Sequence, residues 1–256
     1  MFSPLEVRQR AISWGEGKCA LPILRMFVLG ILAGAFIALG ALASIFSNVY
    51  AGRFAGACIF ACGLAMTVVM GAELFTGNSL LVMGALSRKV TMGSVLRNWV
   101  VVYIANLVGG LLIALIASYG GLFSNPDVAA AVVSTAAGKA NLSFSSALLK
   151  GILCNVLVCS AVMMNLSTKT TEGKALLVFL PVAAFVVSGT EHCVANMFYL
   201  PAGLFTSGIC GIEAAGLSVG TALLNNLLPV TIGNIIGGCL LGIAYWVGHR
   251  PAKEEA

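Results

Sequence analysis

The sequence predicts an all-α integral membrane protein in which six transmembrane helices form an inverted repeat of three plus three. Three features support this prediction: the composition, the spacing of charged residues and an internal repeat. Hydrophobic residues make up 59% of the 256 residues and charged residues only 9%, whereas soluble domains carry about 25% charged residues. Because so few charges cannot cover a soluble surface of this size, we expect lipid to contact most of the outside.

Charged residues divide the chain into six apolar stretches. They cover residues 26–52, 54–87, 98–126, 151–168, 175–212 and 214–248. A helix needs about 20 apolar residues to cross the bilayer core, so four of these stretches hold one span each. The second and fifth are too long for one straight helix, and each has a glycine and a single glutamate near its middle. We therefore predict that these two spans are broken into half-helices.

The chain divides into three parts along its length. Residues 1–22 mix charged and apolar side chains, which indicates an amphipathic segment rather than a secretory signal. We expect this segment either to lie on the membrane surface or to pack beneath the membrane domain. Residues 23–248 form the transmembrane domain, and residues 249–256 form a short tail.

The basic residues predict the orientation. With six spans, the side that holds both termini collects eleven of the 14 lysines and arginines. The opposite side holds Arg53, Lys139 and Lys150. By the positive-inside rule, both termini are expected in the cytoplasm, with the protein in the inner (plasma) membrane.

An internal repeat relates the two halves of the chain. The matching pairs are GILA at 30–33 with GILC at 151–154, GAELFTGN at 71–78 with GTEHCVAN at 189–196, and NLVGG at 106–110 with NIIGG at 234–238. Since each half has an odd number of spans, the second half enters the membrane from the opposite side. Helices broken at corresponding positions of such a repeat indicate the substrate site, and half-helix N-termini with free N–H groups favour an anion there.

His192 is the sharpest candidate for chemistry, because it lies inside the break of the fifth span. Its imidazole can donate a hydrogen bond to an anion or transfer a proton; alternatively, it only satisfies the loop backbone. Thr76 lies in the break of the second span and either bonds substrate and His192 or caps the second half-helix. A loop of small residues is expected at 129–138, just before Lys139. Lys139 and Lys150 either draw anions into an outer vestibule or are ordinary solvated or snorkelling lysines.

The carboxylates Glu73 and Glu191 are the only ones within the spans. A bare carboxylate would repel an anion, so we favour a structural role in which each glutamate accepts loop N–H groups or ties the loop to a neighbour. A proton relay is the alternative. The aligned Asn78 and Asn196 are assigned the same structural role.

Three segments resemble the formate/nitrite transporter family, and the resemblance extends over essentially the whole chain. They are GAELFTGNSLL at 71–81, KGILCNVLVC at 150–159 and LPVAAFVVSGTEHCVANMFYLP at 180–201. The LFTGN loop and Lys150 are most similar to the hydrosulfide-channel branch. The resemblance implies a homopentamer with an aquaporin-like pore in each protomer and with two apolar constrictions around a small chamber.

The resemblance also implies roles for individual residues. Apolar side chains at the constrictions would be Phe60, Leu64, Leu74, Phe75, Val158 and Phe185. Polar groups between or beside them would be Thr76, Asn155 and His192, and Lys139 would be a vestibule lysine. No cofactor, metal or nucleic acid is expected; the partners are small inorganic or one-carbon anions and the lipid bilayer.

A comparison of magnitudes favours passage as a neutral acid. Moving a small ion into a medium of low dielectric costs on the order of 20 kcal/mol in the idealised limit, whereas protonating a weak-acid anion costs about 1.4 kcal/mol per pH unit above its pKa. The expected function is thus a passive channel for small monovalent weak-acid anions, hydrosulfide first and also formate or nitrite. His192 or nearby water would lend the proton.

Other functions remain open at this stage. One is a formate/nitrite transporter with proton coupling. Another is a water or glycerol channel, although such channels carry Asn-Pro-Ala at both breaks and here the breaks read GNS at 77–79 and ANM at 195–197. A membrane enzyme is disfavoured, because it needs clustered nucleophiles, bases or metal ligands.

Overall fold

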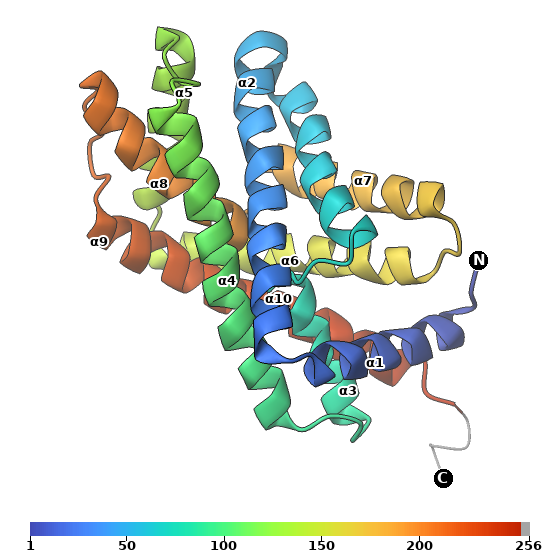
Figure 1. Cartoon of the computed structure of the whole chain (residues 1–256). Coiled ribbons are helices and arrows are strands. Elements are labelled where there is room, and N and C mark those ends of the chain that lie inside the picture. Colours follow the sequence, from blue (N-terminus) through green and yellow to red (C-terminus); the bar gives the residue numbers. More distant parts are fainter. Residues whose placement is uncertain (252–256) are drawn as a thin grey trace.

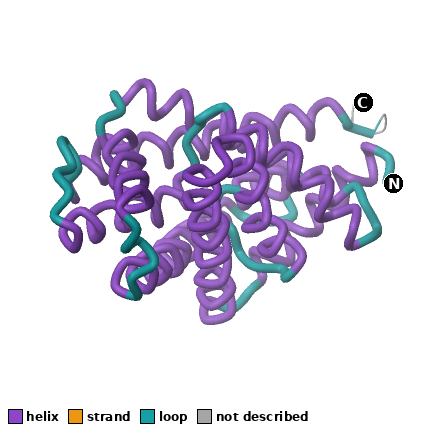
Figure 2. The backbone as a smooth tube through the Cα atoms, turned by 90° about the horizontal axis from the view of Figure 1, so that it is seen from above, coloured by secondary structure: helices purple, strands orange, loops and turns teal. Residues whose placement is uncertain are grey.

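The computed structural model describes residues 1–251, and these are helical apart from short turns and loops (Figures 1 and 2). The elements are α1 (Pro4–Ala20), α2 (Ile23–Val69), η1 (Gly77–Leu81), α3 (Val82–Leu86), α4 (Met92–Tyr119), α5 (Pro126–Ala140), α6 (Phe144–Leu166), α7 (Thr171–Val187), α8 (Cys193–Cys210), α9 (Val219–Thr221), η2 (Ala222–Leu227) and α10 (Leu228–Gly248). Most of the expected tail, from residue 252 on, lies outside the described residues.

Five helices of the described chain are long and apolar enough to cross a membrane. They are Ile23–Val69, Met92–Tyr119, Phe144–Leu166, Cys193–Cys210 and the continuous helical stretch Val219–Gly248. The all-α, multi-pass membrane fold expected from the sequence is therefore confirmed. Large apolar side chains on these helices, such as Leu153 and Ile116, point outward because lipid is as favourable a neighbour for them as a protein core.

Helix α2 contains the first span and the first half of the second. Its 47 residues would extend about 70 Å as one straight rod, more than twice the thickness of a bilayer core. A kink at Gly52, with φ of 82°, divides the helix and turns the chain back. Figure 1 shows this turn at the upper end of α2.

The second and fifth spans are broken where the sequence predicted. In the second span, α2 ends at Val69 and η1 begins at Gly77; in the fifth, α7 ends at Val187 and α8 begins at Cys193. Gly71 and Gly189 leave the two preceding helices with φ of +69° and +68°. Only glycine adopts this left-handed backbone at little cost, which explains the glycine at each break.

The two halves pack in the same way. Helix α2 runs along α4 in the first half, and α6 runs along α10 in the second. Figure 1 shows the second pair crossing behind the first at a large angle. Each pair joins the first and third spans of its half. Helix α7 packs against α6 and α2, and α8 packs against α4, so the two parts of the broken fifth span contact both halves of the chain.

The segment before Lys139 corrects an expectation, because residues 129–138 were taken as a loop of small residues. They belong to helix α5. The Asn125 side chain accepts hydrogen bonds from the backbone N–H groups of Asp127 and Val128, and Pro126 occupies the first turn. Asparagine caps and N-terminal prolines favour helix starts, and the alanines that follow have the highest helix propensity.

Helix α1 packs beneath the membrane domain rather than lying apart on the membrane surface. Its buried Val7, Ala11 and Ile12 share an apolar cluster with side chains of η1, α3 and α6. The Arg8 Nε donates to the carbonyl oxygen of Trp246 at 3.2 Å. Both views place the N-terminus and the end of α10 on the same side of the molecule, which we call the terminal side (Figures 1 and 2).

Candidate functional site

The two broken spans meet at a hydrogen bond between Thr76 and His192. The Oγ1 of Thr76 lies 2.9 Å from the Nε2 of His192, and both side chains are buried. Thr76 comes from the break before η1 and His192 is the residue that precedes α8. The contact that the sequence suggested between these two residues is therefore present in the structure.

The backbone of α8 determines which nitrogen of His192 carries the proton. The N–H of Ala195 donates to the Nδ1 of His192 at 3.1 Å, so Nδ1 is the acceptor of a neutral ring. The proton then resides on Nε2, which donates to the Oγ1 of Thr76. The hydroxyl proton of Thr76 is left free to bond a third group. The capping role considered for Thr76 is not seen, because its side chain forms no cap hydrogen bond to η1.

Three of the first four N–H groups of α8 are bound within the protein, so most of the free N–H groups that the sequence analysis expected there are engaged. The amide of Cys193 donates to the Oδ1 of Asn234 at 2.9 Å, and the amide of Ala195 is bound to the His192 ring. The amide of Asn196 donates to the carbonyl oxygen of His192 at 3.0 Å. These groups orient the histidine and the break instead of binding an anion directly.

Two asparagines satisfy the backbone of the breaks in parallel. Asn106 accepts from the amide of Phe75 at 2.9 Å and donates to the carbonyl oxygens of Gly30 and Glu73 at 2.7 and 2.9 Å. The equivalent Asn234 binds Cys193, Gly151 and Glu191 in the same pattern. Because non-helical backbone at membrane depth needs internal partners, these side chains are what allows both helices to be interrupted.

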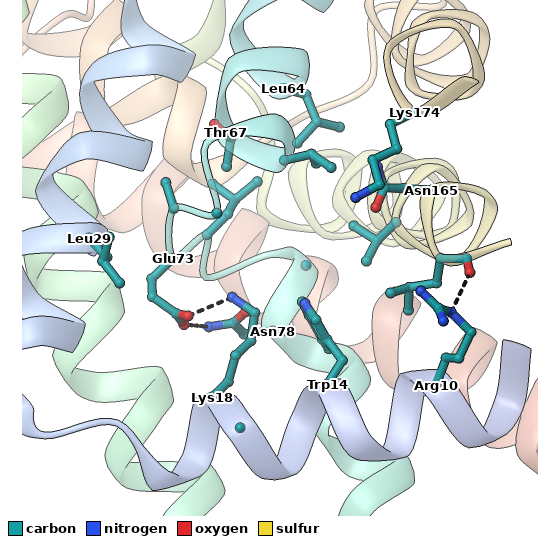
Figure 3. A pocket seen from close by; sticks show the side chains of 18 of the residues that line it. Arg10, Trp14, Lys18, Leu29, Leu64, Thr67, Glu73, Asn78, Asn165 and Lys174 are labelled. Carbon is teal, nitrogen blue, oxygen red and sulfur yellow. Dashed lines mark hydrogen bonds and ion pairs between the residues drawn. The ribbon is translucent and has the colours of Figure 1, made fainter. Parts of the chain in front are cut away.

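Glu73 is held by side chains from three elements. It forms an ion pair with Lys18 of α1 at 2.7 Å and accepts from the Nδ2 of Asn78 at 2.8 Å and of Asn98 at 3.4 Å. Burial lowers the pKa of the Lys18 ammonium, and the Glu73 carboxylate opposes that shift. Figure 3 shows Lys18, Glu73 and Asn78 meeting at one wall of a cavity.

Glu191 is held in the same way in the second half. It pairs with Lys139 of α5 at 3.0 Å and accepts from the Nδ2 of Asn196 at 2.7 Å and of Asn226 at 3.2 Å. Glu73 and Glu191 therefore tie the breaks to neighbouring elements, which is one of the two structural roles predicted for them. The other role, acceptance of loop N–H groups, is wrong for these carboxylates, because the donors are side chains.

The ion pair also corrects the interpretation of Lys139. This lysine was expected either to draw anions into an outer vestibule or to be an ordinary solvated lysine, but its charge is neutralised by Glu191. The matching partner Lys18 was missed, although it precedes Lys139 by 121 residues, the same offset as Gly30 and Gly151. Asn98 and Asn226 were missed too, although they share the offset of 128 residues that separates Asn106 from Asn234.

Asn155 and Lys150 occupy supporting positions on α6. The Nδ2 of Asn155 donates to the carbonyl oxygen of Thr76 at 3.1 Å and also bonds the carbonyl oxygen of Asn234, so it joins the two halves. The side chain of Lys150 is half-buried, and its carbonyl oxygen accepts from the amide of Glu191 at 3.4 Å. Lys150 lines neither of the two cavities that lead toward Thr76 and His192.

Two cavities approach the Thr76–His192 pair from opposite ends. The terminal-side cavity has a volume of about 560 Å³ and is lined by Leu64 and Leu74 (Figure 3). The opposite cavity has a volume of about 150 Å³ and is lined by Phe60, Phe185 and His192. The two linings share no residue, so buried side chains close the path between them.

Apolar side chains form that closure. The rings of Phe60 and Phe185 meet edge to face with centroids 5.7 Å apart, and Phe185 stacks on His192 at 5.8 Å. Phe75 packs against Tyr103 at 4.9 Å. The six side chains expected at constrictions are all buried: Phe60, Leu64, Leu74, Phe75, Val158 and Phe185. Their arrangement is compatible with two constrictions, which stay a prediction.

Known proteins are similar to this chain in sequence and in fold. The model of the formate/nitrite transporter family matches residues 5–247. The chain belongs to this family. It is similar to the formate channel FocA of Escherichia coli strain K12, with 39% identity over all of this chain and 97% of FocA. FocA of Haemophilus influenzae is 37% identical, covering 93% of this chain and 91% of that protein.

Solved structures of formate/nitrite transporters share the fold. One, described as a pentameric formate channel with formate bound, has a TM-score of 0.78 and 30% identity, and covers 89% of this chain and 97% of its own. Another, described as an FNT family ion channel, has a TM-score of 0.86 and 26% identity, with 96% and 99% coverage. Members of this family are transporters and channels rather than enzymes, so the chain is a transport protein of the membrane.

Proposed function

We propose that this protein is a passive channel for small monovalent weak-acid anions and that formate is its principal substrate. The observation that carries the proposal is the Thr76–His192 hydrogen bond, buried between two water-accessible cavities and flanked by apolar side chains. Formate channels among the relatives support the choice of formate. The similarity of the LFTGN loop at residues 74–78 to hydrosulfide channels makes hydrosulfide the second candidate.

The apolar closure selects for the neutral acid. An ion of this size loses its water on entering an apolar passage, at a cost of many kcal/mol. A formate anion that takes a proton avoids this cost for about 1.4 kcal/mol per pH unit above its pKa. Chloride has no weakly acidic conjugate form, so this route is closed to it. Selectivity for weak acids over chloride follows.

Thr76 and His192 serve as hydrogen-bond donors in this proposal, and the cavity water supplies the proton. The Nε2–H of His192 polarises the Thr76 hydroxyl, whose remaining proton is then available to bond the crossing acid. Protonating His192 at Nδ1 would break the bond from the amide of Ala195, and removing Nε2–H from a neutral ring would leave an imidazolate. Both steps are unfavourable, so we infer that the ring stays neutral during transport.

The assembly and orientation complete the proposal. We infer a homopentamer with one pore in each protomer, supported by the pentameric formate channel of the same fold. Eleven of the 14 basic residues on the terminal side support cytoplasmic termini in the inner (plasma) membrane.

Flux measurements in proteoliposomes test the function. Purified protein is reconstituted, and formate, nitrite, hydrosulfide and chloride are each given a gradient at fixed pH. We expect formate to equilibrate down its gradient without a second driving ion, and chloride to remain excluded. Chloride flux equal to formate flux would refute the neutral-acid route. Passage of the neutral acid moves one proton with each formate. Formate accumulation under a pH gradient beyond the equilibrium of the free acid would therefore indicate a transporter coupled to additional protons. Osmotic swelling in glycerol without anion flux would indicate a solute channel.

A further inference from the structure

Each cavity contains a cation other than the lysine that its glutamate neutralises. Arg53 lines the opposite cavity, together with the Lys139–Glu191 pair. Lys174 lines the terminal-side cavity, together with the Lys18–Glu73 pair. Within residues 1–251, the side chains of Arg53 and Lys174 form no hydrogen bond or ion pair. Each therefore presents an uncompensated positive charge at a pore mouth.

These two cations occupy equivalent positions of the internal repeat. The dipeptide Gly52-Arg53 precedes Gly173-Lys174 by 121 residues, the offset that also relates Gly30 to Gly151. The guanidinium of Arg53 lies directly over the break of the fifth span, because a Cβ on Gly189 would come within 2.6 Å of its Nη2. The duplicated position thus brings a cation to both ends of the path.

A buried polar side chain that lacks an ordinary hydrogen bond accompanies each cation. The Nδ2 of Asn165 has no hydrogen-bond partner in the described chain, and the Oγ of Ser44 forms no hydrogen bond of ordinary geometry there, although the Tyr199 side chain lies beside it. Ser44 and Asn165 are only 1% and 7% exposed. Ser44 lines the cavity of Arg53, and Asn165 lines the cavity of Lys174. Ser44 and Asn165 are again 121 residues apart. A buried polar group without an ordinary hydrogen bond destabilises a protein, and here both halves keep one at the same place.

We propose that Arg53 with Ser44, and Lys174 with Asn165, form two repeat-related docking sites for the permeating anion, one at each mouth of the pore. The inference rests on the proposed function and names the residues that concentrate its substrate. A cation beside a neutral polar group suits a small monovalent carboxylate such as formate. The carboxylates in each cavity do not compete, because Glu191 and Glu73 are engaged by Lys139 and Lys18. Figure 3 shows Asn165 and Lys174 across the terminal-side cavity from Lys18 and Glu73.

Saturation of formate flux in oriented membrane vesicles tests the two sites separately. Right-side-out and inverted vesicles are prepared, with orientation checked by protease access to the N-terminal segment. We expect Arg53→Gln to raise the half-saturating formate concentration about threefold to tenfold when formate is supplied on the Arg53 side, with little change from the other side. Lys174→Gln should give the mirror-image result, and high salt should reduce both effects.

Matched variants separate docking from folding. Arg53→Lys and Lys174→Arg keep the charge and should retain most of the wild-type saturation behaviour. Lys169→Gln removes a terminal-side charge that lies over the ring of Phe2, outside both cavity linings, and should leave saturation unchanged. The oligomer of every variant is checked by size-exclusion chromatography.

The outcomes distinguish this inference from the proposed function. If the wild-type protein carries formate and both glutamine variants saturate like the wild type from both sides, the docking sites are refuted and the channel function stands. Equal effects from the two sides would also refute them, because each site serves one mouth. A wild-type protein that carries no formate contradicts both proposals.

Discussion

Removing the ammonium of Lys139 tests whether this lysine serves structure rather than anion capture. The Lys139→Met variant keeps the length of the side chain and leaves Glu191 without its counter-ion. Lys139 Nζ lies 3.0 and 3.1 Å from the two carboxylate oxygens, and the side chains are only 16% and 6% exposed. Breaking a buried ion pair in this way costs about 3–5 kcal/mol, because an uncompensated charge remains.

The amides of Asn196 and Asn226 stay in place and still donate to Glu191. We therefore expect a loss of about 3 kcal/mol, at the lower end of that range. For a chain of this size, such a loss corresponds to a fall in melting temperature of roughly 6–12 °C. The double variant Lys139→Met/Glu191→Gln removes both charges and should recover most of the stability.

Thermal unfolding of the detergent-solubilised protein, followed by tryptophan fluorescence at a fixed heating rate, measures the effect. The surviving oligomer is quantified at each temperature. Formate flux of the double variant, measured below its melting temperature, should remain close to that of the wild type. A single variant as stable as the wild type but with weakened formate saturation, unrescued in the double variant, would refute the structural role and restore Lys139 as an anion-attracting residue.

Four further variants test the site and the helix packing around it. His192→Asn should retain formate flux with an unchanged pH dependence, measured between pH 5 and 8 in proteoliposomes. The reason is that the pH dependence reflects protonation of the substrate. A changed pH dependence of the flux would assign proton transfer to the His192 ring. Thr76→Val should lower formate flux about tenfold, because one hydrogen bond to the crossing acid is lost. Thr76→Ser keeps the hydroxyl and should preserve the flux. Equal formate flux in the two variants would contradict the donor role of Thr76. Gly237→Ala should destabilise the oligomer by about 1–3 kcal/mol, because the added Cβ would lie 2.2 Å from the carbonyl oxygen of Ile152; unchanged thermal stability would show that α6 and α10 can separate freely.

The membrane fold was predictable because its signals are local in the sequence. The composition predicts the long apolar stretches. Gly71 and Gly189 predict the interrupted spans, and both adopt positive φ values at the breaks. The internal repeat by itself places Thr76 and His192 in corresponding breaks. Apolar length and glycine position depend only on residue type and place in the sequence, so predictions based on them agree with the structure.

The errors concern residues whose meaning depends on a distant partner. The pairing of Lys139 was not predicted, because Glu191 lies 52 residues away along the chain and no local pattern shows that the two meet. Lys18 was only one basic residue among many until α1 placed it against Glu73. Residues 129–138 were expected as a loop because their side chains are small, but the Asn125 cap and the helix propensity of alanine favour a helix there.

By itself, the sequence determined that this chain is a membrane protein, how many times it crosses the bilayer and where two of its helices break. These properties depend on the length of apolar stretches and on the conformation of single glycines, which are local features of the chain. Only the tertiary structure decided which charges are neutralised, which nitrogen of His192 carries the proton and which side chains face each cavity. Those properties depend on groups from distant parts of the chain that the fold brings within about 3 Å of each other, the separation at which hydrogen bonds form and at which charges pair most strongly.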